Sequence, residues 1–192
     1  MNALMYRIWL LRNRIGRLRV LNAAPKHGIC AEIGVWKGDF SRRILQWCRP
    51  RELHLIDPWL FAADFPERWY GGAIARSQQD MDAIMDAVVS RFSANPSVRV
   101  HRGKSHDIVE QFPDEYFDWI YIDGNHSYEA VLDDLQTWHR KVKCGGVIGL
   151  DDYDWRDESR QLSVRAAIAK FVDTTKVQAA KAVQGQFLIR KA

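Results

Sequence analysis

Short apolar runs alternate with segments of helical periodicity along most of this sequence. Most apolar runs stop at or near a glycine, a proline or an acid, and a stretch with apolar residues three and four positions apart follows the first five of them. This alternation predicts an α/β fold: a doubly wound, mostly parallel sheet with helices on both faces, joined by right-handed crossovers. Two closely spaced runs at the end predict an antiparallel hairpin at one edge. The predicted strands are 29–35, 52–57, 97–103, 117–123, 145–152, 176–183 and 186–190.

The segments between these strands predict helices with one apolar face each. Asp39 is expected to cap a helix that buries Phe40, Ile44 and Trp47. The stretch from Ser77 to Asp80 resembles a capping box, with Asp in place of the usual Glu. The remaining helices are predicted from Ser77 onward with Met81, Ile84, Met85, Val88 and Phe92 on one side, near 106–112, around Val131, Leu135, Trp138 and Val142, and near 160–172.

Residues 1–24 are predicted to form a basic amphipathic helix that precedes a domain at 25–192. Leu4, Ile8, Leu11, Ile15 and Leu18 step by four and three, which places them on one helical face. Six basic residues and no acid precede Glu32, so the net charge of +4 belongs to this arm and not to the domain. We expect the apolar face to pack on the domain or on a second copy of the chain. An anionic membrane surface or an RNA is the alternative partner.

Composition narrows the setting of the protein. Cys30, Cys48 and Cys144 lack C-x-x-C spacing, which favours a reducing, cytoplasmic location over a disulfide framework or a zinc site. No apolar run reaches the ~20 residues that cross a bilayer, and the N-terminus lacks the apolar region of a signal peptide. Because the domain itself carries no excess of basic residues, no nucleic-acid partner is expected for it.

Candidate chemistry follows the strands, since ligands of doubly wound sheets bind beyond the carboxyl ends of the strands. The first strand leads into Glu32-x-Gly34-x-Trp36-x-Gly38, whose glycines permit a sharp turn and close approach to a ligand. Trp36 stands where a dinucleotide fingerprint has its middle glycine, so that pattern is broken. Asp57 ends the second strand, where an acid can accept both ribose hydroxyls of a nucleoside; an ordinary turn acid is the alternative.

The other strand ends are polar as well. Gly103 and Ser105 form a turn that can border an adenine ring or be a simple turn. Asp123 ends the fourth strand and Asp151-Asp152 the fifth, and neighbouring strands would bring these three carboxylates together. Like charges repel unless a cation compensates them, and Mg²⁺ or Ca²⁺ is the usual one. The alternative is that some of these acids cap helices or pair with basic residues.

His126 follows Asp123 by three positions, in Asp-Gly-Asn-His. Its ordinary pKa of ~6.5 suits a general base at neutral pH. It serves equally well as a residue that fixes the turn into the next helix.

Four segments together resemble successive motifs of class I S-adenosylmethionine-dependent methyltransferases: "AEIGVWKGDFS", "LHLIDPW", "IYIDGNHSYEAVLDDLQTW" and "GGVIGLDDY". The similarity is greatest to the small branch with an Asp-Gly-x-His-x-Tyr motif, which resembles cation-dependent O-methyltransferases of sugars and natural products. It covers roughly residues 28–155 and leaves the basic helix out. The resemblance implies a Rossmann-like, seven-stranded sheet with an antiparallel last strand.

The resemblance also implies roles for the strand-end residues. S-adenosylmethionine would lie with its methionine end against the backbone around Gly34 and its ribose against Asp57. The cofactor-binding residues implied are Glu32, Gly34, Trp36, Gly38, Asp57, Gly103, Ser105 and Asp123; Asp123, Asp151 and Asp152 would bind Mg²⁺ or another divalent cation.

The expected reaction is methyl transfer to a hydroxyl of a small metabolite or sugar, with His126 or Asp123 as the base. Trp36, Trp59, Trp69 and Trp155 either line an acceptor pocket or pack between loops. The "WYGGA" stretch (69–73) is either a lid or a turn. The alternatives are a nicotinamide-dependent oxidoreductase and a non-enzymatic cofactor-binding domain that docks through its basic helix.

Overall fold

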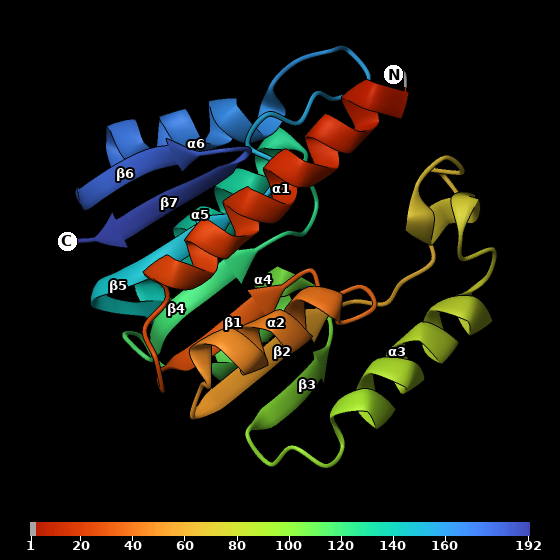
Figure 1. Cartoon of the computed structure of the whole chain (residues 1–192), viewed down its shortest axis with the longest axis horizontal. Coiled ribbons are helices and arrows are strands. Elements are labelled where there is room, and N and C mark those ends of the chain that lie inside the picture. Colours follow the sequence, from red (N-terminus) through yellow and green to blue (C-terminus); the bar gives the residue numbers. More distant parts are fainter. Residues whose placement is uncertain (1–2) are drawn as a thin grey trace.

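Seven strands form a single sheet in the computed structural model, which describes residues 3–192 and their side chains from residue 13 onward (Figure 1). The strand order is β3-β2-β1-β4-β5-β7-β6. Strands β1 to β5 are parallel, and β7 is antiparallel to both β5 and β6. The predicted α/β fold and its C-terminal edge hairpin are therefore confirmed. The strands are β1 Ile29–Ile33, β2 Glu52–Asp57, β3 Val98–Arg102, β4 Phe117–Ile122, β5 Val142–Leu150, β6 Val177–Val183 and β7 Gln186–Lys191.

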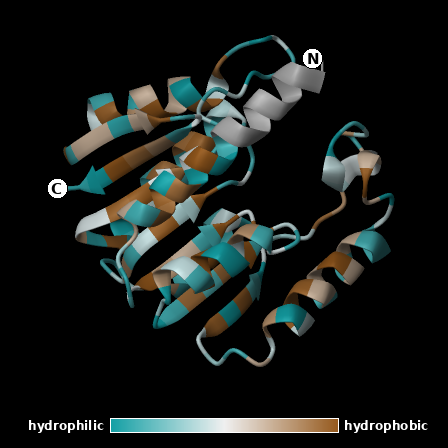
Figure 2. Cartoon of the chain, viewed as in Figure 1, coloured by the Kyte–Doolittle hydropathy of each residue, from teal (hydrophilic) through white to brown (hydrophobic). Residues whose placement is uncertain are grey.

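Helices cover both faces of the sheet and bury a separate apolar layer on each. The layer under α1, α2 and α3 includes Leu21, Ile44 and Val88. The opposite layer, under α4, α5 and α6, includes Leu135 and Ile168. In Figure 2 the apolar residues lie mostly where helices and strands face each other. The helices are α1 Ala3–Ala23, α2 Asp39–Cys48, α3 Gln78–Phe92, α4 Ser105–Ile108, α5 Tyr128–Lys141 and α6 Ser163–Thr174, with short turns η1 Trp69–Ala73 and η2 Val109–Gln111.

Three local predictions were wrong. Asp39 is the first residue of α2 and not its cap, which is Gly38 and has no side chain to make a capping hydrogen bond. Trp47 is 43% exposed and not on the buried face of α2, where Cys48 takes its place. Val142 is the first residue of β5 and not the last apolar position of α5, because the chain passes directly from helix to strand there. The predicted cap of α3 is confirmed, since the Ser77 side chain accepts a hydrogen bond from the Asp80 backbone N–H.

Helix α1 docks on the sheet by a face that the apolar stripe does not identify. Ile15 and Leu18 are only half-buried, whereas Gly16, Val20 and Leu21 are buried. Ile15 and Leu18 therefore contact the domain only in part, and packing of the stripe on a second copy of the chain stays a prediction; the side chains of Leu4, Ile8 and Leu11 lie outside the described residues. Glycine decides the docking face, because a Cβ at Gly16 would lie 2.4 Å from the Gln184 carbonyl oxygen of the β6–β7 turn. Within the described residues, no helix has the length and apolarity needed to cross a membrane.

Gly16→Ala is expected to lower the free energy of unfolding by about 1–3 kcal/mol, as overpacking usually does. Alanine is otherwise the better helix former by about 1 kcal/mol, so the expected sign is opposite to helix propensity. Urea denaturation would measure the change. Arg14→Ala, at an exposed position of the same helix, is the matched control and should change little. A Gly16→Ala protein as stable as wild type would show that α1 does not dock this closely.

Candidate active site at the carboxyl ends of the strands

Consecutive strand ends are tied together by backbone hydrogen bonds at one edge of the sheet. The Gly34 N–H donates to Ile56 O (2.9 Å), the Asp123 N–H to Ile33 O (2.7 Å) and the Asp151 N–H to Ile122 O (3.0 Å). Because β2, β1, β4 and β5 are parallel neighbours, this rim carries the residues that follow each of them. The structure therefore brings the glycine turn and the acids of strands β4 and β5 to one place.

The glycine turn packs directly against the end of β4. Gly34 has φ +88°, and a Cβ there would lie 2.0 Å from the Asp123 carbonyl oxygen. Only glycine permits both the left-handed backbone and this close approach. Gly38, with φ +73°, precedes the first turn of α2. The turn from Gly34 to Gly38 thus lies beside Asp123, where a ligand in the turn would meet the acids.

Asp57 holds this turn from the neighbouring strand. Its carboxylate accepts the backbone N–H groups of Val35 and Trp36 (2.9 Å each) and of Trp59 (2.7 Å). Burial raises the pKa of Asp57, and these three hydrogen bonds oppose that effect. A carboxylate offers about four acceptor positions, so little of this one remains for a ribose. The structure places Asp57 at the predicted edge but shows it holding the backbone of the turn.

Glu32 lies behind the turn and is 2% exposed. Its carboxyl accepts a hydrogen bond from the Ser41 hydroxyl of α2. Burial raises the pKa of Glu32 to about 8, so it is mostly protonated at neutral pH. Glu32 is therefore bonded to α2 inside the protein and is not accessible from the open rim.

The side chain of Ser105, in the turn after β3, points into the protein. The Ser105 hydroxyl donates to the Asp134 carboxylate of α5 and accepts the indole N–H of Trp138 at 2.6 Å. Gly103 is joined to β2 through its N–H, which donates to Asp57 O at 3.1 Å. Both residues reach the predicted edge, and only their backbone atoms are left to border a ligand.

Arg17 of α1 lies in the middle of the acid cluster. Its Nη2 is 2.7 Å from Asp123 Oδ2, and its Nε is 2.8 Å from Asp151 Oδ2, which Nη2 also contacts. Burial alone would raise the pKa of Asp151, but the Arg17 guanidinium holds it below its ordinary value. Sequence reasoning missed Arg17, because no pattern links a residue of the basic helix to acids more than 100 positions away.

Asp151 is completely enclosed, and its side chain is 0% exposed. Besides Arg17, it accepts the Asp152 backbone N–H (2.8 Å) and the side-chain amide of Gln186. Gln186 in turn accepts the Tyr121 hydroxyl at 2.6 Å. The final strand β7 therefore takes part in the site through a glutamine that sequence reasoning also missed.

His126 lies on the open side of the same cluster. Its Nε2 is 3.7 Å from Asp123 Oδ1 and 3.4 Å from Asp152 Oδ2. Burial alone would lower the pKa of His126, but the three surrounding carboxylates raise it. Burial and the charge of Asp151 raise the pKa of Asp123 to about 7 and that of Asp152 to about 6. The imidazole of His126 therefore takes up a proton readily, because the neighbouring carboxylates stabilise the imidazolium that forms.

Aromatic side chains border this rim from three loops, which follow β1, β2 and β5. The His126 ring packs against Trp155 with a centroid distance of 5.2 Å, and the guanidinium carbon of Arg68 lies 4.9 Å from the centre of the Trp155 ring. Trp36 and Trp69 approach to 6.0 Å, and Trp69 is 60% exposed. Trp59 is fully buried and packs between loops. The predicted role of Trp36, Trp69 and Trp155 in lining an acceptor pocket stays a prediction, whereas Trp59 is enclosed by the protein itself.

The sequence model of the protein family described as "Methyltransferase domain" matches residues 31–153, more than half of the chain. A comparison with curated proteins finds no match. Similar solved structures include the O-methyltransferase NovP, with 19% identity, a TM-score of 0.58, and coverage of 96% of this chain and 79% of NovP. A SAM-dependent methyltransferase from Aquifex aeolicus has 14% identity, a TM-score of 0.59, and coverage of 94% of this chain and 90% of its own.

The same fold also occurs in a spermidine synthase from Thermotoga maritima. That chain is 13% identical, with a TM-score of 0.60, and the match covers 96% of this chain and 59% of the synthase. At these identities the likeness shows the fold alone, so the reaction must be argued from the site.

Proposed function

This chain belongs to the methyltransferase-domain family, and we propose that it transfers a methyl group from S-adenosylmethionine to a hydroxyl oxygen of a small molecule. The observation that carries the proposal is the packing of the Gly34 turn on Asp123, with His126 beside it. A cofactor held by the turn would place its reactive carbon next to an acid–base pair. A hydroxyl acceptor needs such a pair, because it is a weak nucleophile until it loses its proton.

S-adenosylmethionine supplies a methyl group on a positively charged sulfur, which leaves with the electrons of the broken carbon–sulfur bond. His126 Nε2 takes the proton of the acceptor hydroxyl as the oxygen–carbon bond forms. Asp123 and Asp152 stabilise the resulting imidazolium at 3.7 and 3.4 Å. Trp155 packs against the imidazole ring, with 33° between the two ring planes. The chain thus contributes orientation and a place for the proton.

The divalent cation implied by the resemblance stays a prediction. The predicted ligand set of Asp123, Asp151 and Asp152 does not fit, because four hydrogen bonds already fill the acceptor positions of Asp151. Ligand atoms of Asp123, His126 and Asp152 do lie within 4.8 Å of one another. These three would hold a cation that lowers the pKa of the acceptor hydroxyl. His126 could not then serve as the base, since both roles use Nε2.

Equilibrium dialysis tests the proposal most directly. Purified protein is expected to bind S-adenosylhomocysteine saturably and NADH not at all. Transfer of labelled methyl groups to a panel of diols, sugars and phenols would then identify the acceptor class. Binding of NADH in place of S-adenosylhomocysteine would favour the oxidoreductase alternative and reject this proposal.

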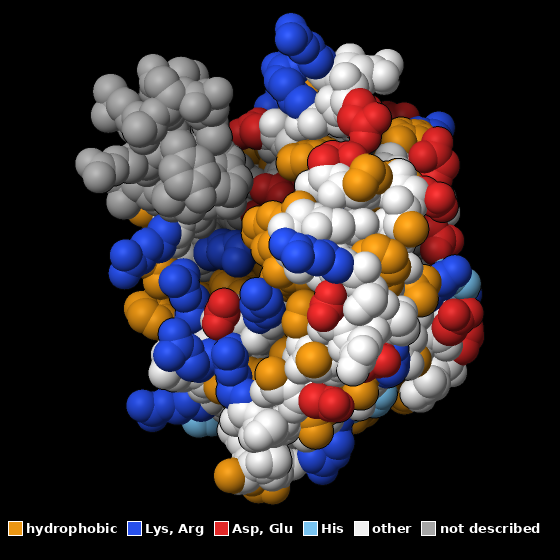
Figure 3. Space-filling model, turned by 90° about the vertical axis from the view of Figure 1, so that its right-hand side faces the viewer, with side chains coloured by type: hydrophobic (Ala, Val, Ile, Leu, Met, Phe, Trp, Pro, Cys, Tyr) orange, Lys and Arg blue, Asp and Glu red, His pale blue; other side chains and the backbone are white. Residues whose placement is uncertain are grey.

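Docking of the basic helix on a membrane or an RNA is the second candidate function. In Figure 3, Lys and Arg side chains gather over one half of the face shown. Arg14 and Arg19 are exposed on α1, whereas Arg17 is directed into the acid cluster. Such binding should weaken steeply with salt, because phosphates release counterions when they are neutralised. The exposed part of Ile15 and Leu18 also leaves the predicted contact with a second copy as a proposal.

A further inference from the structure

Three carboxylates meet at the rim, and their mutual repulsion needs a positive partner. We propose that Arg17 is the resident cation of this site: its guanidinium takes the place in which a divalent cation would bridge Asp123 and Asp151. The proposal rests on the contacts of the acid cluster and holds whether or not the chain transfers methyl groups to hydroxyls.

The first support is the hydrogen bonding of Asp151. A carboxylate has about four acceptor positions. Arg17 Nε and Nη2 take those of Oδ2, and the Asp152 N–H and the Gln186 amide take those of Oδ1. A metal ion could bind Asp151 only after one of these donors had left. Arg17 is the donor that also contacts Asp123, so it occupies the bridging position.

The second support is the distribution of positive partners over the cluster. Arg17 contacts Asp123 and Asp151, and His126 contacts Asp123 and Asp152. Each of the three carboxylates therefore has a nitrogen partner from the chain itself. An arginine is charged at every pH at which proteins fold, so the compensation by Arg17 is permanent.

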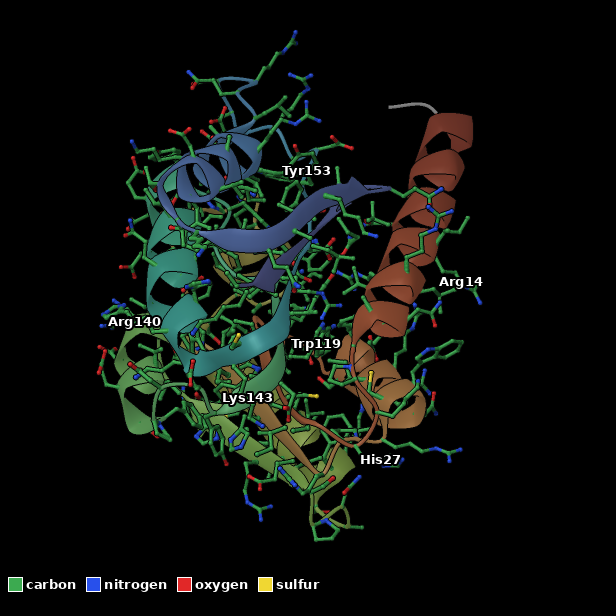
Figure 4. All side chains as sticks on the ribbon, turned by 90° about the vertical axis from the view of Figure 1, so that its left-hand side faces the viewer. Arg14, His27, Trp119, Arg140, Lys143 and Tyr153 are labelled. Atoms are coloured by element: carbon green, nitrogen blue, oxygen red, sulfur yellow. The ribbon has the colours of Figure 1, made fainter. Side chains whose placement is uncertain are left out.

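The third support is that α1 holds Arg17 in position from several sides. The guanidinium carbon lies 5.1 Å from the centre of the Phe40 ring, and the side chain is only 29% exposed. Gly16, the preceding residue, brings the helix into contact with the β6–β7 turn. Figure 4 shows α1 running alongside the sheet, with Arg14 on the side turned away from it. Arg17 is thus a fixed part of the site, and Arg14 is a solvent-exposed residue of like charge one turn away.

Manganese binding to the full-length protein tests the proposal without any acceptor. Mn²⁺ suits carboxylate sites, and its free concentration is measured by electron paramagnetic resonance at neutral pH. Wild type and the Arg14→Met control are expected to bind Mn²⁺ weakly and equally. Arg17→Met is expected to bind it at least about tenfold more tightly, a gain of about 1.4 kcal/mol. The double variant Arg17→Met/Asp151→Asn should lose that gain, since it lacks the carboxylate that Arg17 had covered.

Each other result would overturn the proposal. Saturable Mn²⁺ binding to wild type that Arg17→Met does not tighten would show that Arg17 and the ion do not share a place. A gain retained in the double variant would place the ion away from Asp151. If Arg17→Met does not fold by circular dichroism, Arg17→Gln provides the same comparison, because glutamine keeps hydrogen-bond donors for the carboxylates but carries no charge; unchanged Mn²⁺ affinity in it would reject the proposal. Loss of S-adenosylhomocysteine binding is a separate result, which concerns the proposed function alone.

Discussion

Asp151→Ala is expected to lower the free energy of unfolding by about 3–5 kcal/mol, the range seen when one partner of a buried ion pair is removed. The substitution leaves the Arg17 guanidinium, the Gln186 amide and the Asp152 N–H without their acceptor in a fully enclosed position. The Tyr121–Gln186 hydrogen bond would also be disturbed. Urea denaturation at pH 7.5, with circular dichroism as the signal, would measure the loss.

Asp152→Asn is the matched control, because Asp152 is the next residue and its pKa is shifted in the opposite direction: the pKa of Asp151 is lowered and that of Asp152 is raised. Its folded-state pKa of about 6 is raised by burial and by the charge of Asp151. A raised pKa means that ionisation destabilises the folded state, so stability is lost as pH rises from the unfolded value of ~3.9 through about 6. The neutral amide removes this loss, and asparagine tolerates the positive φ at this position. Asp152→Asn should therefore be at least as stable as wild type at pH 7.5, and equal losses in both variants would contradict the assignment of Arg17 to Asp151.

The architecture follows from the sequence because its signals are local. Apolar runs such as 117–123 are buried strands whose length and flanking residues show in the sequence itself, and handedness rules restrict how they connect. The parallel order then places every strand end on one rim. The errors lie where a tertiary contact overrides periodicity. Trp47 follows the apolar spacing of α2 but is 43% exposed. In α1 it is Gly16, and not its apolar neighbour Ile15, that lies in close contact with the domain.

The meeting of the acids at one rim was predictable from the sequence, and the approach of Arg17 to them was not. Asp123, Asp151 and His126 each follow a strand, so their approach to one another depends only on sheet order. Arg17 reaches them through the docking of a helix that lies outside the alternating pattern, and Gln186 through the insertion of β7 between β5 and β6. The sequence correctly predicts that three carboxylates approach one another, but their repulsion can be compensated in two ways, by a bound metal ion or by a basic side chain. A bound ion and an internal guanidinium leave the same pattern at the strand ends.

The second large effect is expected in catalysis. His126→Gln should lower kcat/KM by about 10²–10⁴-fold, the usual contribution of general acid–base catalysis, while S-adenosylhomocysteine binding stays unchanged. In wild type the pKa of His126 is raised above its ordinary value of ~6.5, so the neutral imidazole that can accept a proton forms only at a higher pH. The rate should therefore rise with pH above ~6.5 and level off once the imidazole has lost its proton. The glutamine variant should lose this limb, because it has no imidazole to deprotonate.

His106→Gln is the control for this experiment, since His106 is 57% exposed on α4 and away from the acid cluster. A pH–rate profile of kcat/KM for wild type, His126→Gln and His106→Gln separates the possible roles of His126. If His126 only fixed the turn after β4, its replacement would lower stability and cofactor affinity and would leave the shape of the profile intact. A limb that persists in His126→Gln would instead assign the titrating base to Asp123, whose pKa of about 7 lies in the same region because of burial and the neighbouring Asp151 charge. Loss of the limb together with intact cofactor binding is the result that only proton transfer at Nε2 explains.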